Sequence, residues 1–380
     1  MRIDGALRVA GGILCCLLPV VWGGAVGAET VRVLVAEGKS AVTVASSGGL
    51  TLTDGGSGRI LLQRPSAAPV RLLLQGGAVV VREAGVSVPA VWIWPGRLAT
   101  VELEGRAYRG RLQVQPMNGG LAAVNAVDLE EYLQGVIKDE IPPDWPAEAT
   151  KAMAVAARTY AVYQLRQNPE TLFHLRSTTA SQVYGGATGE DLRTTWAVQA
   201  TRGQVLTFGG QPISAFYHAC SGGATEDGAK VFGENFDMLV GVEDDFSLAC
   251  PYALWIEQLS AAQIEKALGR AGYVVRGVVA IQPVSRSRTG RVLRLAVDHR
   301  GGRLLIDGRR FREVVGNETL RSTNFDVRGD GALFTFLGRG SGHGVGLSQW
   351  GAKEMADFAY QYQDILKFYY PLAQISQLGG

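Results

Sequence analysis

Short apolar runs, most of them alternating with polar residues, fill the chain from Val31 to about Met117. The runs are VRVLVAE, AVTVAS, LTLT, RILLQ, VRLLLQ, AVVVRE, ATVELEG and RLQVQ, and clusters such as DGGSG separate them. A two-residue period bounded by turn residues is typical of β-strands. We therefore predict an all-β domain over residues 29–118. It contains no His or Cys and no cluster of carboxylates, so we expect it to serve binding or spacing rather than chemistry.

The apolar spacing becomes helical after residue 120. Apolar side chains recur at i, i+3, i+4, i+7 and i+8, at Leu129, Tyr132, Leu133, Val136 and Ile137. Asp128 followed by Glu131 has the form of a capping box at the start of this helix. The helix must end near Glu140, because the two prolines at 142–143 cannot continue it.

The remaining pattern mixes helices and strands. A second helix is predicted from about Pro146 through KAMAVAARTYAVYQL, a third over 190–201 and another near 260–268. A hairpin is expected around 209–210, and strands in VVRGVVAIQPV, RVLRLAVDH and RLLID, before a glycine-rich loop leads into a final helix. Since one core rarely grows past about 250–300 residues, we predict a separate α+β catalytic domain over residues 119–380.

The first 28 residues have the pattern of a signal peptide. Arg2 and Arg8 accompany an apolar run over 9–21, and the small residues at 26–28 suit cleavage after Ala28. An uncleaved membrane anchor is the alternative. Cys15 and Cys16 each follow a large residue, which argues against a lipoprotein signal. We expect an exported protein of the periplasm or cell envelope that contacts a membrane only if the leader is retained.

The composition and the absence of several motifs argue against some classes of function. The chain has 37 Lys+Arg against 35 Asp+Glu, a net charge of +2, so it lacks the basic character that nucleic-acid binding requires. No G-x-x-x-x-G-K-[ST], G-x-S-x-G or H-E-x-x-H motif is present, which argues against nucleotide hydrolysis, serine-hydrolase and zincin chemistry. Among the reaction classes considered, catalysis by carboxyl side chains remains.

Glu140, in KDEIPPDWP, is the leading candidate acid. The negative end of the helix dipole and the adjacent Asp139 should both raise its pKa, as a general acid requires. The alternative is an exposed helix end without function. Asp144 could be a second carboxylate, although an Asp before a helix is more often a cap.

Arg158 and Tyr160 fall on the otherwise apolar helix AVAARTYAV. A buried arginine needs a carboxylate partner or a ligand, and Glu140 is the candidate partner. The alternative is a side chain that reaches the surface.

The remaining candidates lie in the C-terminal half. Removing the leader leaves Cys220 and Cys250 in an oxidising compartment, so we expect a disulfide between them. A zinc site made of these two cysteines and His218 is a weaker alternative, and no other cofactor is expected. His343 lies in GRGSGHGVGLSQWGA, where glycines allow close backbone approach, or alternatively form a buried turn.

Five strings in order resemble the SpoIID/LytB family. They are VNAVDLEEYLQGVIKDEIPPDWPAEATKAMAVAARTYAV, SQVYGG, FYHACSGGATED, LRSTNFDV and GRGSGHGVGLSQWGAKEMA, over roughly residues 121–372. The resemblance implies a lytic transglycosylase that cleaves peptidoglycan glycan strands stripped of stem peptides and leaves 1,6-anhydromuramic ends. It implies catalytic roles for Glu140 and Arg158. It also implies substrate-binding roles for residues in the family motifs, namely Tyr160, Tyr184, His218, Ser221, His343, Ser348 and Gln349.

Two other functions remain open from the sequence. The first is a non-catalytic envelope protein that binds glycan strands and stimulates a cell-wall amidase. The second is an ordinary hydrolase that uses Glu140 with Asp144 and leaves reducing ends.

Overall fold

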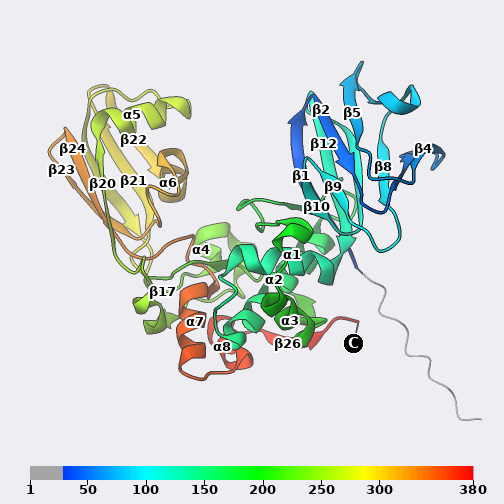
Figure 1. The fold of residues 1–380 in the computed structure, drawn as a ribbon. Helices are drawn as coiled ribbons and strands as arrows, with labels where there is room; N and C mark the ends of the chain where they lie inside the picture. The colour runs from blue at the N-terminus through cyan, green and yellow to red at the C-terminus, as the bar shows by residue number, and fades with distance from the viewer. Residues whose placement is uncertain (1–28, 380) are drawn as a thin grey trace, which may run out of the picture.

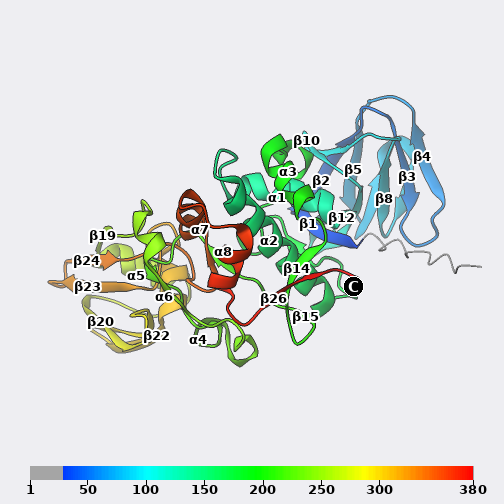
Figure 2. The ribbon, with the colours of Figure 1, turned by 90° about the horizontal axis from the view of Figure 1, so that it is seen from below.

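The computed structural model describes residues 29–379, so the predicted leader over 1–28 lies outside the described residues. Two β-rich lobes rise from a helical core, one at each end of the molecule, as both views show (Figure 1 and Figure 2). The predicted α+β class is confirmed. Within residues 29–379, no helix has the length and apolar character needed to cross a membrane.

The N-terminal lobe is a β-sandwich. One sheet has the order β13-β1-β12-β11-β8-β3-β4 and the other β10-β9-β2-β5-β6-β7. Alternating burial along these strands turns one apolar face of each sheet toward the core between them. The strands are β1 Thr30–Lys39, β2 Ala41–Ala45, β3 Leu50–Asp54, β4 Ile60–Arg64, β5 Val70–Gln75, β6 Ala78–Val81, β7 Val86–Val88, β8 Val91–Pro95, β9 Val101–Leu103, β10 Arg106–Tyr108, β11 Arg111–Met117 and β12 Gly120–Asp128, with β13 Leu175–Arg176 added parallel to β1.

Strand β12 joins this lobe to the helical core. It pairs with both β1 and β11 and is buried from Gly120 to Val127. Its last residue, Asp128, caps α1 by accepting hydrogen bonds from the backbone N–H groups of Glu130 and Glu131. The sheet therefore extends ten residues past the position where the change in sequence pattern placed the end of the β domain.

The helical core surrounds α2, a 21-residue helix whose alanines let neighbours pack closely. Its other helices are α1, α3, α7 and α8, and a small sheet β15-β14-β26 covers one side. The bounds are α1 Leu129–Glu140, α2 Ala147–Gln167, α3 Leu192–Ala200, α7 Gln349–Asp357, α8 Tyr362–Tyr369, β14 Gln204–Phe208, β15 Gln211–Pro212 and β26 Gln374–Gln377. The predicted helix end at Glu140 and start at Pro146 are confirmed.

The C-terminal lobe has an apolar core of its own, with Phe311, Phe325, Phe334 and Phe336 at its centre. It is built from the sheets β19-β24-β23 and β20-β21-β22 with two helices. The bounds are β19 Trp255–Ser260, α5 Ala261–Arg270, β20 Val278–Arg286, β21 Val292–His299, β22 Gly302–Asp307, α6 Gly308–Val315, β23 Phe325–Gly329 and β24 Leu333–Gly338. The chain leaves the helical core for this lobe and returns to it through the glycine-rich loop before α7.

Short elements complete the fold, most of them between α3 and the C-terminal lobe. They are η2 Gly186–Gly189, β16 Tyr217–His218, β17 Gly223–Ala224, α4 Gly228–Phe232, η3 Glu234–Phe236, β18 Glu243–Asp244 and η4 Asp245–Ala249, with β25 Leu347–Ser348 parallel to β16 and η1 Arg82–Ala84 in the sandwich.

Candidate active site

A cavity of about 590 Å³ lies between the helical core and the C-terminal lobe. The core contributes Glu140 at the end of α1, Tyr160 of α2 and Gln349 at the start of α7. The lobe contributes residues of β21 and α6. The walls also include β16, α4 and the glycine loop, through Tyr217, His218, Lys230, Phe232, Gly342 and His343. The cavity thus brings together residues that are up to about two hundred positions apart in the sequence.

Glu140 is held in the cavity wall by three neighbours. Its Oε1 accepts a hydrogen bond of 2.8 Å from the backbone N–H of Val183. The hydroxyl of Tyr217 and the amide of Gln349 also hydrogen-bond its carboxyl group. The Gln349 Nε2 further donates to the Glu140 backbone carbonyl at 3.2 Å, which closes the C-terminal end of α1. The carboxyl group therefore has a fixed orientation toward the cavity.

The pKa of Glu140 is raised, in the direction that the sequence predicts, but mainly for another reason. Burial of the carboxyl group is the largest cause, because a low-dielectric environment disfavours the charged form. The hydrogen bonds from Val183, Tyr217 and Gln349 act in the opposite direction, and the charge of Asp139 adds the smallest upward contribution. A raised pKa keeps more of the acid protonated near neutral pH.

Tyr217 connects Glu140 to a buried hydrogen-bond chain. The hydroxyl of Tyr132 donates to Gln182 Oε1 at 3.0 Å, and Gln182 Nε2 donates to the Tyr217 hydroxyl at 3.1 Å. Because that hydroxyl accepts from Gln182, its own proton is free to point at the Glu140 carboxylate. This series of hydrogen bonds therefore stabilises the negative charge of Glu140 when its carboxyl group is ionised.

Both histidines of the cavity are neutral near pH 7. Burial lowers the pKa of His343 to about 3, and its Nδ1 accepts a hydrogen bond from the Val345 N–H at 3.1 Å. Burial lowers the pKa of His218 as well, and its Nδ1 lies 3.2 Å from the Val345 carbonyl. A neutral ring that donates from Nδ1 carries a lone pair on Nε2, and this atom of His218 is buried without a partner among the described residues. His218 is thus a buried neutral ring and not a charged group.

The glycine-rich loop lies directly against β16. A Cβ on Gly346 would lie 2.0 Å from the carbonyl oxygen of Phe216, and one on Gly342 would lie 2.7 Å from Cβ of His218. Both glycines have positive φ, at +71° and +102°. The glycines are therefore required for close approach, as the sequence suggests, and this approach brings His343 to a ring-centroid distance of 5.4 Å from His218.

Aromatic side chains of the cavity wall lie beside His343. Phe216 and Phe232 stack with centroids 4.3 Å apart, and Phe232 contacts the ring of His343 edge-on at 5.3 Å. The guanidinium of Arg309, on α6, lies 6.0 Å from the Phe232 centroid. Apolar ring faces beside hydrogen-bonding groups are the combination that a sugar ring requires.

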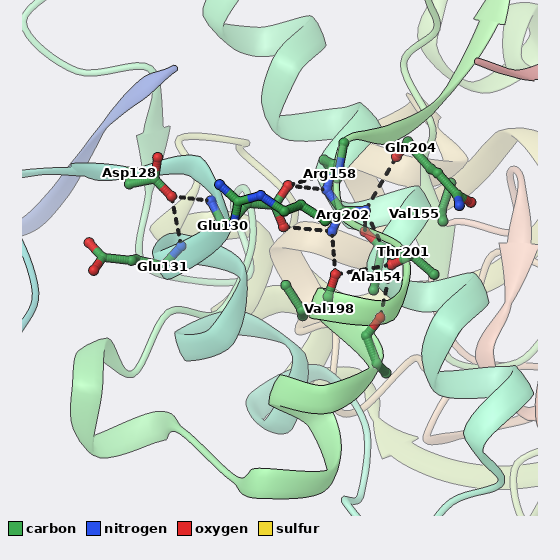
Figure 3. Close-up of polar contacts among 12 residues, drawn as sticks. Asp128, Glu130, Glu131, Ala154, Val155, Arg158, Val198, Thr201, Arg202 and Gln204 are labelled. Atoms are coloured by element: carbon green, nitrogen blue, oxygen red, sulfur yellow. Dashed lines mark hydrogen bonds and ion pairs between the residues drawn. The ribbon is translucent and has the colours of Figure 1, made fainter. Parts of the chain in front are cut away.

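Arg158 does not reach the cavity, and the expectation that it pairs with Glu140 is wrong. Its partner is Glu130, to which Nε and Nη2 donate at 2.9 and 2.8 Å (Figure 3). Further donation goes to the carbonyl of Val198 at 3.0 Å and to that of Gln204 at 3.3 Å. The side chain is fully buried. With its donors used in this way, Arg158 ties α2 to α1 and α3, so its place is structural.

Three other predicted binding residues also lie outside the cavity. Tyr184 is buried in the core, where its hydroxyl donates to Asn125 Oδ1 at 2.8 Å. Ser348 caps α7 and accepts from the backbone N–H of Ser221, whose side chain bonds Ser247. Tyr160, His218, His343 and Gln349 do line the cavity. Asp144 is exposed, and it neither lines the cavity nor caps α2.

Cys220 and Cys250 are free thiols in this structure, in place of the expected disulfide. They are both buried and lie close enough for a hydrogen bond between their side chains. Within residues 29–379, no group of three or more His, Cys, Asp or Glu is arranged to hold a metal ion. The alternative zinc set with His218 is therefore not assembled among these residues.

Several cavity residues gave no signal in the sequence. Tyr217 stands beside His218 in FYHACSGG, and only the register of β16 brings its hydroxyl to Glu140. Arg291 and the residues of α6 belong to the C-terminal lobe and enter the site by tertiary packing. No local pattern could have found them.

Comparison with known proteins identifies two segments of this chain. Residues 117–208 match the family model described as stage II sporulation protein (SpoIID), and residues 238–346 match a domain of unknown function. The chain is 35% identical over 269 residues to an uncharacterized protein of Brachyspira hyodysenteriae, a match that covers 70% of this chain and 72% of the relative.

Two further relatives have functional names. Stage II sporulation protein D of Bacillus subtilis is 32% identical over 272 residues, 67% of this chain and 76% of the relative. The amidase enhancer of Bacillus subtilis is 30% identical over 284 residues, 63% of this chain and 39% of the relative. The similarity to stage II sporulation protein D covers most of both chains. The chain belongs to the SpoIID/LytB family.

Proposed function

We propose that the protein is an exported lytic transglycosylase that cleaves peptidoglycan glycan strands in this cavity, with Glu140 as its acid and base. The observation that carries the proposal is the environment of Glu140. It is a carboxyl group with a raised pKa, held in the wall of a cavity that offers aromatic side chains and neutral polar groups. A glycan strand needs both kinds of group, and its cleavage needs a protonated acid.

In the proposed reaction, the protonated Glu140 donates its proton to the glycosidic oxygen that follows a muramic acid residue. The bond between that oxygen and the anomeric carbon breaks. The C6 hydroxyl of the same muramic acid bonds to the anomeric carbon, and its proton passes to the Glu140 carboxylate. The products are a strand with a free hydroxyl and a strand with a 1,6-anhydromuramic end, and Glu140 is protonated again.

The neighbours of Glu140 suit both halves of this cycle. The hydrogen bonds from Val183, Tyr217 and Gln349 stabilise the carboxylate after it has lost its proton. Burial favours the protonated form before and after the reaction. Burial therefore supports Glu140 as an acid, and the hydrogen bonds support it as a carboxylate that takes the proton back.

A second carboxylate is not needed for this reaction, and two of the other acids in the cavity lining are engaged in local hydrogen bonds. Glu226 accepts from the Asp227 N–H and from the hydroxyl of Thr289, and Asp307 caps α6. Asp144 is exposed elsewhere. Glu313 and Glu318 also line the cavity, so the nature of the products decides between transglycosylation and hydrolysis by two carboxylates.

The experiment is product analysis with purified residues 29–380 and peptide-free glycan strands. We expect products one water lighter than hydrolytic ones, and we expect their loss in E140Q. D144N is the matched control and should keep full activity, because Asp144 is exposed and outside the cavity. Reducing ends that disappear in D144N would instead identify the two-carboxylate hydrolase.

A second candidate function rests on the similarity to the amidase enhancer. Under this alternative the cavity binds glycan strands without cleaving them and presents them to a cell-wall amidase. Strand binding without products from any strand type, together with faster amidase turnover in the presence of the protein, would favour it. Both functions place the protein in the cell envelope.

A further inference from the structure

A second pocket, of about 300 Å³, lies on the outer face of the seven-stranded sheet in the N-terminal lobe. We call it the outer groove. Trp92, Arg111 and Gln113 line one side of it, and Thr171 and Leu172 line the other. It shares no residue with the lining of the cavity around Glu140. The outer groove is therefore a separate site, in the lobe at the other end of the molecule from the C-terminal lobe (Figure 1).

The alternation of side chains along the strands creates the outer groove. On β11, Leu112 is fully buried in the core between the two sheets, so its neighbours Arg111 and Gln113 project from the opposite face. Ala126 of β12 pairs in register with Arg111 of β11 and with Arg32 of β1. A methyl group between two long side chains leaves a hollow, and Ala126 therefore forms the floor of the outer groove.

The segment that follows α2 is fixed along the other side. The Arg32 Nη2 donates to the backbone carbonyls of Pro169 and Thr171 at 2.7 and 2.6 Å. Leu172 packs against the apolar cluster that covers the neighbouring part of the same sheet face. These contacts hold the segment on the sheet, so the outer groove is preformed.

Two tryptophans of β8 stack with Arg111 at the first side. The guanidinium carbon of Arg111 lies 4.6 Å from the ring centroid of Trp92 and 4.4 Å from that of Trp94. Trp94 is 39% exposed, and its Nε1 donates to the Thr53 hydroxyl at 3.3 Å, which fixes the ring. The strand thus presents large, rigid aromatic rings beside a planar cation on an open sheet face.

Polar groups beside these rings can bind a ligand. Within residues 29–379, Arg111 forms no salt bridge, and none of its side-chain nitrogens is both buried and without a partner. The Gln113 Nε2 donates to Gln115 Oε1 at 3.1 Å, which leaves the amide oxygen of Gln113 as an acceptor. The described lining contains no acid, histidine or thiol, so this site suits binding and not acid–base catalysis.

This combination of groups fits a sugar polymer. The C–H face of a pyranose ring stacks on an indole ring, and its hydroxyl and acetamido groups exchange hydrogen bonds with planar side chains such as those of Arg111 and Gln113. Peptidoglycan glycan strands consist of such rings, each with an acetamido group. A strand could therefore lie in the outer groove without any reaction there.

We propose that the outer groove binds peptidoglycan glycan strands and anchors the protein to the cell wall. The choice of ligand rests on the proposed function, since the same polymer enters the cavity. Trp92 and Arg111 lie before residue 117 and outside both segments that match family models, so the proposal gives the N-terminal lobe a role of its own. Anchoring at a second site raises the effective concentration of strands at the cavity.

The first test measures which tryptophans a bound strand protects from oxidation. The full chain from residue 29 with E140Q, in which the strand should stay intact, is exposed to hydroxyl radicals with and without peptide-free glycan strands, and mass spectrometry follows each tryptophan. We expect protection of Trp92 and Trp94 but not of Trp196, which is 52% exposed on α3. The described cavity lining contains no tryptophan, so a strand in the cavity alone cannot give this result.

Variants measure the size of the effect. E140Q/W92A should bind insoluble strands at least about 10-fold more weakly than E140Q, the loss typical of an aromatic residue at the centre of a binding site. E140Q/R111Q should bind about 3- to 10-fold more weakly, the range for a lost hydrogen bond. E140Q/W196A is the matched control and should bind as E140Q does. Circular dichroism and urea midpoints show whether each variant is folded.

Unprotected Trp92 and Trp94 in the presence of bound strands would overturn the proposal, as would undiminished binding by both groove variants. Protection by free stem peptides and not by strands would also overturn it, since the outer groove would then bind peptides. Product analysis on the wild type is run in parallel. Cleavage without protection would reject the role of the outer groove and keep the transglycosylase, and protection without cleavage would do the reverse.

Discussion

Replacing Arg158 with Met tests whether this arginine is structural or catalytic. In the structure it pairs with Glu130 through two hydrogen bonds and supplies donors to the carbonyls of Val198 and Gln204. The R158M variant keeps the length of the side chain but leaves the Glu130 carboxylate buried, with the Gly203 N–H at 3.1 Å as a remaining donor.

The expected loss of stability is large. Removing one partner of a buried ion pair costs about 3–5 kcal/mol, and the weaker hydrogen bonding of the Gln204 carbonyl adds to this cost, with incomplete additivity. The Val198 carbonyl keeps the Thr201 hydroxyl as a donor. We therefore expect R158M to lower the free energy of unfolding by at least about 4 kcal/mol, a large fraction of the ~5–15 kcal/mol of a typical domain. E130L/R158M should be less destabilised than the sum of the two single variants, because it leaves no unpaired charge.

The assay is urea unfolding at pH 7, followed by tryptophan fluorescence. The chain has separate apolar clusters, so the transition that includes the helical core should move and that of the C-terminal lobe should not. R166M, at the exposed end of the same helix, is the control and should change stability by less than about 0.5 kcal/mol. If R158M were as stable as the wild type and yet inactive, the structural role would be refuted and a catalytic one restored.

Three further predictions concern the cavity. E140Q should be at least as stable as the wild type at pH 7, because burial raises the pKa of Glu140 and its carboxylate therefore destabilises the fold above that pKa. This difference in urea midpoint should vanish at a pH below the pKa of Glu140 in the unfolded chain. A less stable E140Q at pH 7 would contradict the prediction. Y217F should raise the pKa of Glu140 further and move the alkaline limb of kcat/KM to higher pH, since the Tyr217 hydroxyl stabilises the carboxylate; an unmoved limb would contradict this. G344A should destabilise more than G210A in thermal unfolding, because both positions have positive φ but only a Cβ at Gly344 collides with Arg291; equal losses would refute the packing argument.

The sequence predicted local structure well where one physical signal was strong. The prolines after Glu140 end α1 as expected, and Asp128 caps its start. The predicted hairpin at 209–210 forms with both glycines at positive φ. Each of these features depends on backbone preferences of a few adjacent residues, which a single sequence displays.

The site was harder to predict because it depends on distant packing. Glu140 was identified by its helix-end position, yet its pKa is raised chiefly by burial, which no sequence pattern shows. Arg158 was correctly expected to need a partner, but Glu130 and Glu140 are both on α1, and only the packing of α2 against it decides between them. Arg291 comes from the C-terminal lobe, whose position against the core is a property of the whole chain.

The central claim, that Glu140 catalyses an intramolecular transfer and not hydrolysis, is tested most directly by running the cleavage reaction in water labelled with oxygen-18. A transglycosylase forms the new bond with the C6 oxygen of muramic acid, so the new anhydro ends should carry no label. A hydrolase places one oxygen from water on each new reducing end. Unlabelled products that are lost in E140Q are the predicted result, and labelled reducing ends would contradict the account.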